Sequence, residues 1–229
     1  MQPSPSIRNP KAVLFDLDGT LIDHFNVIYR CYVHAQEQLK LPVTDFETVK
    51  RTVGGSVPVT MSRLMPGEYV DRAVELFREH FHNIWQEDIT VLPGVFRLLE
   101  HLNAQGIKCG IFTNKHGEYS RKIAAYTGLD KHVSVVVGSL DTAWRKPEKE
   151  FSEYALEKIG ARANETFMIG DSPFDDQAGK IVGMKTYLVA TGSHTLEQLL
   201  AESPDGAFAD FIELGEKVFN LSPDTVVTD

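Results

Sequence analysis

The 229-residue sequence has only two cysteines, no long apolar run and no excess of positive charge. Cys31 and Cys109 are too few for a disulfide framework or a cysteine metal site, so we expect reduced thiols. No apolar run approaches the roughly 20 residues of a membrane span, and the N-terminus lacks the basic-then-apolar order of a signal peptide. A formal net charge of -9 argues against nucleic-acid and membrane partners. We therefore expect a cytoplasmic protein that acts on small molecules.

The sequence contains short β-rich runs that alternate with helical patterns. Apolar residues at helix-like spacing separate the runs, and glycines stand where C-terminal helix caps belong. Near-continuous apolar strands that alternate with helices predict an α/β fold with a Rossmann-like, doubly wound parallel sheet, covered on both faces. The runs are AVLFDL (12–17), IKCGIFT (107–113), VSVVVG (133–138), TFMIGD (166–171) and KTYLVA (185–190).

A long stretch between the first two runs is rich in helical pattern and poor in strand signal. We expect an inserted α-helical cap at residues 23–89 and a Rossmann-like core made of residues 1–22 and 90–229. Pro93 and Gly94 predict the turn back into the core, so a hinge is expected near residues 89–93. The helical patterns of the insert span residues 27–39, 46–53 and 70–85.

Polar side chains stand where the apolar runs end. Asp16, Thr113 and Asp171 each close one run, and Lys146 follows the third run. Ligands of an open α/β sheet bind beyond the carboxyl ends of its strands. The steps from Thr113 to Lys146 and on to Asp171 are each about one βα unit long, so these groups are expected to converge. Side chains two apart on a strand point the same way, so Asp18 is expected beside Asp16.

The residue types of this group indicate phosphoryl transfer. A nucleophilic carboxylate, a second carboxylate that carries a proton, a hydroxyl, an ammonium and acidic ligands for a hard cation suit an aspartyl-phosphate mechanism. Gly19 would let the backbone turn tightly and approach the phosphate. Asp-x-Asp-Gly also begins calcium loops, but the twelfth position here is Val27 and not a bidentate Glu. We therefore reject calcium binding.

Four segments carry a resemblance to a known family. They resemble the four ordered motifs of the haloacid dehalogenase superfamily of phosphohydrolases. The helical insert is similar in position to the cap between the first two motifs of the phosphoglycolate phosphatase-like group, and the resemblance covers nearly the whole chain. The segments are DLDGT (16–20), IFTN (111–114), RKPE (145–148) and GDSPFDD (170–176).

The resemblance implies a role for each catalytic residue. Asp16 would attack phosphorus and become a phospho-aspartate. Asp18 would protonate the leaving oxygen and then take a proton from the attacking water. Thr113 and the Asn114 amide would hydrogen-bond the phosphoryl group, and Lys146 would offset its negative charge.

The resemblance also implies a Mg²⁺ site. Asp16 and Asp171 would bind the ion through carboxylates and Asp18 through its backbone carbonyl, and Asp175 would bind directly or through water. Asp176 is the less favoured member of its adjacent pair, and either acid alone could serve to stabilise a helix N-terminus.

Some alternatives remain open. Superfamily dehalogenases and phosphonatases lack the acid at Asp18, so this residue favours P–O chemistry. Hexose-phosphate mutases with a related cap carry a His where Ile28 stands here, which disfavours a phosphosugar mutase. An inorganic pyrophosphatase and a non-enzymatic phospho-aspartate signalling module are further alternatives to a phosphatase for small esters.

The cap segment RTVGGSVPVTMSRL (51–64) is similar to the substrate loop of phosphoglycolate phosphatase-like caps. Our hypothesis is that Arg51 or Arg63 meets an anionic part of a small phosphorylated metabolite, with phosphoglycolate as the lead. A monomer or a homodimer is expected.

Overall fold

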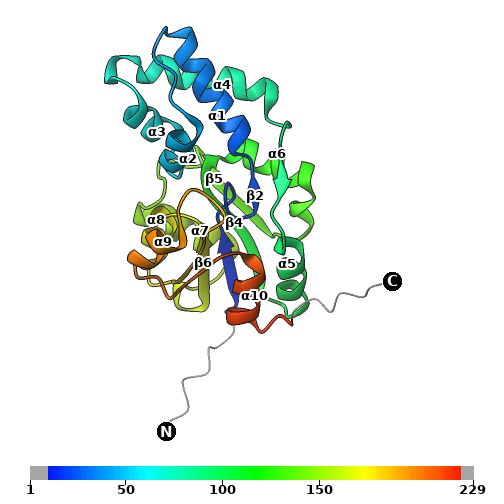
Figure 1. Cartoon of the computed structure of the whole chain (residues 1–229). Helices are drawn as coiled ribbons and strands as arrows, with labels where there is room; N and C mark the ends of the chain where they lie inside the picture. The colour runs from blue at the N-terminus through cyan, green and yellow to red at the C-terminus, as the bar shows by residue number, and fades with distance from the viewer. Residues whose placement is uncertain (1–9, 223–229) are drawn as a thin grey trace.

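A computed structural model describes residues 10–222 and contains a six-stranded parallel sheet (Figure 1). The strand order is β5-β4-β1-β6-β7-β8. Chain order changes direction at β1, which is the topological switch point of a doubly wound fold. The predicted Rossmann-like sheet is therefore confirmed. Its strands are β1 (Ala12–Phe15), β4 (Lys108–His116), β5 (Val135–Ser139), β6 (Thr166–Gly170), β7 (Lys185–Val189) and β8 (Gly206–Phe208).

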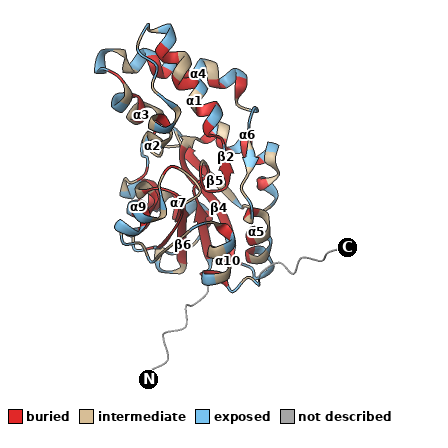
Figure 2. Ribbon diagram, viewed as in Figure 1, coloured by how far each residue is buried: buried red, intermediate tan, exposed pale blue. Residues whose placement is uncertain are grey.

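Helices cover both faces of this sheet, because strand residues alternate between two apolar clusters. Val13 and Phe15 of β1 lie in one buried cluster, and Ala12 and Leu14 lie in the other. On the first face are α5 (Val95–Ala104), α6 (Gly117–Thr127) and α10 (Phe211–Phe219), and on the second are α7 (Lys149–Ile159) and α8 (Pro173–Lys180). α9 (Leu196–Ala201) contacts β7 and β8. Figure 2 shows the buried strands between these partly exposed helices.

The remaining helices form a separate layer above the carboxyl ends of the strands (Figure 1). In the chain, these helices come after β2 (Ile22–Asp23) and before β3 (Thr90–Val91). The two short strands pair with each other in antiparallel fashion. The two chain crossings into this layer therefore run side by side. The layer comprises α1 (Phe25–Gln38), α2 (Phe46–Thr52), α3 (Val57–Leu64), a 3₁₀ turn (Gly67–Tyr69) and α4 (Val70–Ile84), which we call the cap helices.

Some elements differ from the sequence analysis. α3 occupies the segment that was interpreted as a substrate loop, because Ser56 is extended at the N-cap and Pro58 suits the first helical turn. The short strands β2, β3 and β8 were not predicted, since two or three residues carry no periodicity. Short 3₁₀ turns also lie at Leu129–Lys131 and Ala163–Glu165. No helix among residues 10–222 is long and apolar enough to cross a bilayer.

Candidate active site

Three buried carboxylates converge at the switch point of the sheet. Asp16 follows β1, Asp171 follows the neighbouring strand β6, and Asp175 lies in the first turn of α8. One carboxylate oxygen of each residue lies within 4.8 Å of the others. The sheet order thus joins residues that are 155 positions apart in the chain, as their place at adjacent strand ends predicts.

Lys146 is the cation of this cluster, and it is only 2% exposed. Its Nζ lies 2.9 Å from Asp16 Oδ1 and 2.5 Å from Asp175 Oδ1, and it donates to the Phe112 carbonyl at 3.0 Å. Burial alone would lower the pKa of Lys146, but attraction by Asp16 and Asp175 outweighs burial and raises it. The lysine therefore stays charged and holds the Asp16 carboxylate in place.

Asp171 accepts two hydrogen bonds from Ser193 and lies near two other acids. Its Oδ2 accepts hydrogen bonds from the Ser193 backbone N–H at 2.8 Å and the Ser193 hydroxyl at 3.0 Å. Burial, followed by repulsion from Asp175 and Asp16, raises the pKa of Asp171 to about 8. Three carboxylates beside one ammonium leave an excess of negative charge that a divalent cation would neutralise. The oxygen donors therefore fit a hard cation such as Mg²⁺.

The adjacent acids Asp175 and Asp176 have different surroundings. Asp175 accepts from the Ser172 hydroxyl at 2.6 Å and the Ser172 N–H at 3.1 Å, which closes a capping box at the start of α8. Asp176 instead accepts from the Thr186 hydroxyl at 2.5 Å and pairs with Lys180 at 2.7 Å. Asp175 thus belongs to the carboxylate cluster, whereas Asp176 braces α8 against β7.

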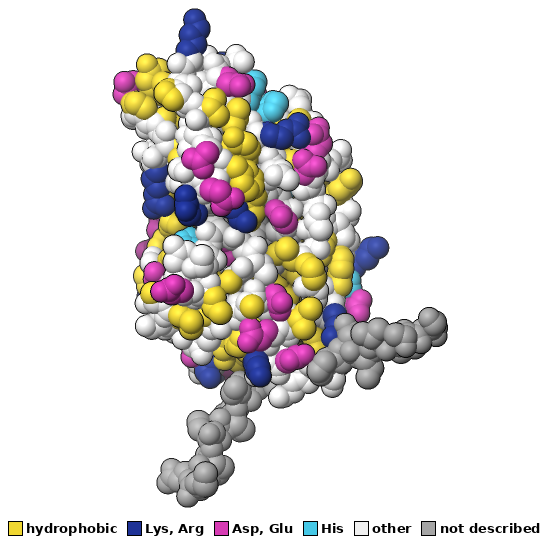
Figure 3. Space-filling model, in the orientation of Figure 1, with side chains coloured by type: hydrophobic (Ala, Val, Ile, Leu, Met, Phe, Trp, Pro, Cys, Tyr) yellow, Lys and Arg dark blue, Asp and Glu magenta, His cyan; other side chains and the backbone are white. Residues whose placement is uncertain are grey.

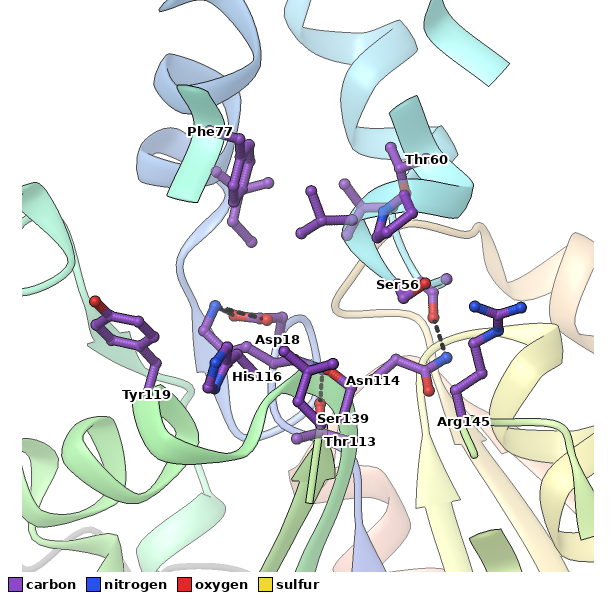
Figure 4. A pocket seen from close by; sticks show the side chains of 18 of the residues that line it. Asp18, Ser56, Thr60, Phe77, Thr113, Asn114, His116, Tyr119, Ser139 and Arg145 are labelled. Atoms are coloured by element: carbon purple, nitrogen blue, oxygen red, sulfur yellow. Dashed lines mark hydrogen bonds and ion pairs between the residues drawn. The ribbon is translucent and has the colours of Figure 1, made fainter. Parts of the chain in front are cut away.

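Asp18 is held by a lysine that the sequence analysis missed. Lys115 Nζ donates to both Asp18 carboxylate oxygens at 2.9 Å (Figure 4). His24 Nδ1 lies 3.4 Å from the same Nζ, and burial, followed by repulsion from Lys115, lowers the pKa of His24 to about 2. His24 is therefore neutral at physiological pH. The only sequence signal for Lys115 was its position directly after the Thr113-Asn114 motif.

Thr113 and Asn114 lie near the end of β4 and line a cavity that is described below. Of the two side chains, only Thr113 keeps a hydrogen-bond donor that no group within residues 10–222 uses. Thr113 Oγ1 accepts from the Lys115 N–H at 3.1 Å. Asn114 Nδ2 donates to the carbonyls of Lys146 and Gly54, both at 3.1 Å, and its Oδ1 accepts from the Lys146 N–H at 2.8 Å. The side-chain amide of Asn114 therefore fixes the Lys146 loop and the cap segment.

Gly19 has a conformational requirement that matches its predicted role. Its φ is 81°, which is the left-handed region that favours glycine. A Cβ at this position would lie 2.7 Å from Asp171 Oδ2. The absence of a side chain thus allows the turn after Asp18 to pack directly against the carboxylate cluster.

A cavity of about 170 Å³ lies between the cap helices and this cluster. Asp18 and Thr113 lie below the cavity on the core, and the side chains of Phe77 and Thr60 lie above it on the cap helices (Figure 4). Asp16 and Asp171 also line it. The cavity therefore opens onto two members of the buried carboxylate cluster.

The two cap arginines of the sequence hypothesis do not line this cavity. Both Arg51 and Arg63 are exposed, and the Arg63 guanidinium lies 5.7 Å from the Phe174 ring, over its face. Neither arginine therefore lines the cavity in this structure, and a role for them toward the substrate stays a prediction. Two other arginines, Arg78 and Arg145, line its exposed edge. On the face shown in Figure 3, basic and acidic side chains mix where the cap helices meet the core.

Comparison with known proteins agrees with the motifs and the fold. The family model described as haloacid dehalogenase-like hydrolase matches residues 13–189. A pyrophosphatase named PpaX from Halalkalibacterium halodurans is 33% identical over 178 residues, which cover 78% of this chain and 82% of that protein. A phosphoglycolate phosphatase from Rhodospirillum rubrum is 29% identical over 218 residues, which cover 90% of each chain.

A solved structure shares the fold at lower identity. The crystal structure of a predicted phosphatase from Clostridium acetobutylicum has a TM-score of 0.84 at 24% identity, and the match covers 93% of this chain and 100% of that chain. The resemblance drawn from the four motifs is thus confirmed. The chain belongs to the haloacid dehalogenase-like hydrolase family.

Proposed function

We propose that the protein is a Mg²⁺-dependent phosphatase that hydrolyses a small phosphate monoester through an aspartyl-phosphate. The observation that carries this proposal is the position of Asp16. Its carboxylate pairs with Lys146 at 2.9 Å, belongs to the buried acidic cluster and lines the cavity below the cap. A carboxylate held in this way is oriented for attack and surrounded by groups that offset the charge of a phosphoryl group.

In the first step an oxygen of Asp16 bonds to phosphorus while the bond from phosphorus to the ester oxygen breaks. Asp18 donates a proton to that leaving oxygen, and the alcohol departs. In the second step a water attacks phosphorus and gives a proton to Asp18. The bond from Asp16 to phosphorus breaks, and inorganic phosphate is released. Thr113 donates a hydrogen bond to the phosphoryl oxygens, and Lys146 offsets their charge in both steps.

The ion pair between Asp18 and Lys115 bears on both proton transfers. Lys115 occupies both carboxylate oxygens of Asp18, at 2.9 Å each. Asp18 reaches a leaving oxygen only when one of these contacts opens. We propose that substrate binding releases this contact, and that the partly buried Lys115 then stays beside the incoming negative charge.

The Mg²⁺ would be held by the carboxylates of Asp16 and Asp171 and by the Asp18 backbone carbonyl. Both oxygens of Asp175 already have protein partners, which favours contact through water. When bound, the cation supplies positive charge against the phosphoryl oxygens and the acidic cluster. Asp175 also orients Lys146, so its removal would affect both the lysine and the ion.

We propose that residues 23–89 act as a mobile cap over this site. The pairing of β2 with β3 gives the two crossings a common hinge, and Asn114 Nδ2 bonds the Gly54 carbonyl of the cap segment at 3.1 Å. A cap that closes would exclude water and complete the contacts to the leaving group. We further propose that the substrate is a small phosphorylated metabolite. The protein itself would be a cytoplasmic monomer or homodimer.

Phosphoglycolate is the lead substrate and pyrophosphate is the second candidate, because a phosphoglycolate phosphatase and a pyrophosphatase are among the relatives of this chain. The test is phosphate release from a panel that contains both compounds, with Mg²⁺ and with chelator. Turnover that needs Mg²⁺ and is lost in folded Asp16→Asn supports the proposal. Turnover that persists in Asp16→Asn, or that is unaffected by chelator, contradicts it.

A further inference from the structure

The roof of the active-site cavity is apolar. It is formed by side chains from three cap helices, and most of the surface that lines the cavity is apolar. The Thr60 hydroxyl, which also lines this roof, donates to the Thr52 carbonyl at 3.4 Å. Six cap residues line this side of the cavity, and we call them the apolar roof: Phe25, Ile28, Tyr32, Val57, Phe77 and Phe81.

The cavity offers little to a negatively charged leaving group. Lys146 and Lys115 are each paired with carboxylates, at 2.5–2.9 Å and 2.9 Å respectively. Arg78 and Arg145 line only the exposed edge, and Arg145 lies 3.4 Å from Glu148. The six residues of the apolar roof carry no charge. A second anionic group against this roof would therefore lose its water without gaining a counter-charge from the roof, which is unfavourable.

The size of the cavity limits the size of the leaving group. The cavity measures about 170 Å³, and an apolar cavity of about 150 Å³ holds one benzene ring. Since a phosphoryl group on the acidic floor would share this volume, the leaving group below Phe77 has to be compact.

One polar atom of the cavity wall has no partner. Ser56 lines the cavity and is 7% exposed, and its Oγ makes no hydrogen bond among the residues that the structure describes. A buried hydroxyl without a partner is costly, and a ligand that supplies one gains the corresponding energy. Ser56 is therefore placed to recognise a single polar atom on an otherwise apolar group.

We propose that the substrate is a phosphate monoester whose leaving group is compact, uncharged and mainly apolar, with one hydrogen-bonding atom that faces Ser56. This inference rests on the proposed phosphatase function and narrows its substrate class. It separates this chain from the compounds in the names of its relatives, because glycolate and phosphate are small, anionic leaving groups.

The first test compares kcat/KM for benzyl phosphate, phosphoglycolate and pyrophosphate with saturating Mg²⁺. Benzyl phosphate and phosphoglycolate both release an alcohol, so their comparison reports on the cavity. We expect benzyl phosphate to be preferred by about tenfold or more, which is the order expected for burying apolar groups in a fitted pocket. Equal or better hydrolysis of phosphoglycolate or pyrophosphate overturns the inference.

Variants of the wall provide the second test. Phe77→Ala should lower kcat/KM for benzyl phosphate about tenfold and change that for pyrophosphate far less. Leu76→Ala is the matched control, because Leu76 is a buried residue of the same helix that does not line the cavity. A loss that is equal for both substrates, or equal in both variants, overturns the role of the apolar roof.

Ser56→Ala removes few packing atoms and tests the polar contact. With the wild-type protein, at least one of the three pyridylmethyl phosphates, which carry one ring acceptor, should be hydrolysed better than benzyl phosphate. Ser56→Ala should abolish that preference, so that the pyridylmethyl phosphate and benzyl phosphate are hydrolysed at rates within about threefold of each other. A preference that survives the substitution, or that is absent from the wild type, removes Ser56 from the proposal.

Binding measurements separate the substrate class from the catalytic mechanism. Calorimetric titration of Asp16→Asn with benzyl phosphate and phosphoglycolate requires no turnover. If no compound releases phosphate, the proposed function fails, and tighter binding of benzyl phosphate would still support the cavity assignment. If turnover follows the aspartyl-phosphate mechanism but phosphoglycolate binds as tightly or more tightly, the inference fails alone.

Discussion

The substitution Lys146→Met would remove the ammonium from the buried acidic cluster while it keeps the length and much of the volume of the side chain. Three carboxylates would then remain together without a cation, since Lys146 Nζ lies 2.9 Å from Asp16 and 2.5 Å from Asp175. Removal of one partner from a buried ion pair costs about 3–5 kcal/mol. For a protein of this size, that loss corresponds to a fall in Tm of about 6–20 °C.

The assay is urea unfolding in chelator at pH 5 and pH 8, repeated with saturating Mg²⁺. The destabilisation should be largest at pH 8 in chelator, because the carboxylates are then ionised, and Mg²⁺ should recover part of it. Lys149→Met is the matched control, since this exposed lysine pairs with Glu153 on the helix surface, and its loss should be small. Equal destabilisation at both pH values, with no effect of Mg²⁺, would refute the electrostatic account.

Three further predictions concern pH, the cap contact and the exposed arginines. In chelator, the free energy of unfolding should fall as pH rises from about 4 to about 8, because native Asp171, with its pKa raised to about 8, keeps a proton that the unfolded chain releases near its ordinary pKa. Denaturant melts across this range check it, and a rise would contradict it. Asn114→Ala should lower kcat about tenfold in steady-state assays without unfolding the protein, because the Lys146 backbone loses two hydrogen bonds; unchanged kcat would refute this role. Arg51→Ala and Arg63→Ala should leave kcat/KM within about twofold, and a larger loss would contradict their placement outside the cavity.

The buried acidic cluster below the cavity was largely predictable from the sequence. In a parallel sheet, residues at the carboxyl ends of adjacent strands must meet, so Asp16 and Asp171 were predictable partners from the apolar runs before them. Gly19 was predictable from its place in the turn, and its positive φ agrees. Local chemistry and strand order are both encoded within short segments, which is why this part could be derived.

The roof of the site could not be derived in the same way. Which side chains of a helix face a cavity depends on the helix boundaries and on packing, and α3 was not anticipated. Arg63 was consequently assigned to the substrate, whereas it lies over Phe174. Lys115 was missed because its contact with Asp18 spans 97 positions and follows no local pattern.

The same limit applies to the hydrogen bonds of the Asn114 side chain. The sequence predicts a contact between the Asn114 amide and the phosphoryl group, and Asn114 does line the cavity. Its donors are nevertheless used by Gly54 and Lys146, which come from two segments distant in the chain. Proximity to a site can be predicted from strand order, but the satisfaction of hydrogen bonds requires the tertiary structure.

The central claim is that Asp16 becomes phosphorylated. The most direct measurement is to quench the enzyme with borohydride during turnover, which reduces an aspartyl-phosphate to homoserine, and to locate the product by mass spectrometry of peptides. The account predicts homoserine at position 16 in the wild type and none in Asp16→Asn. Turnover without homoserine, or homoserine at Asp18 or Asp171, would contradict it.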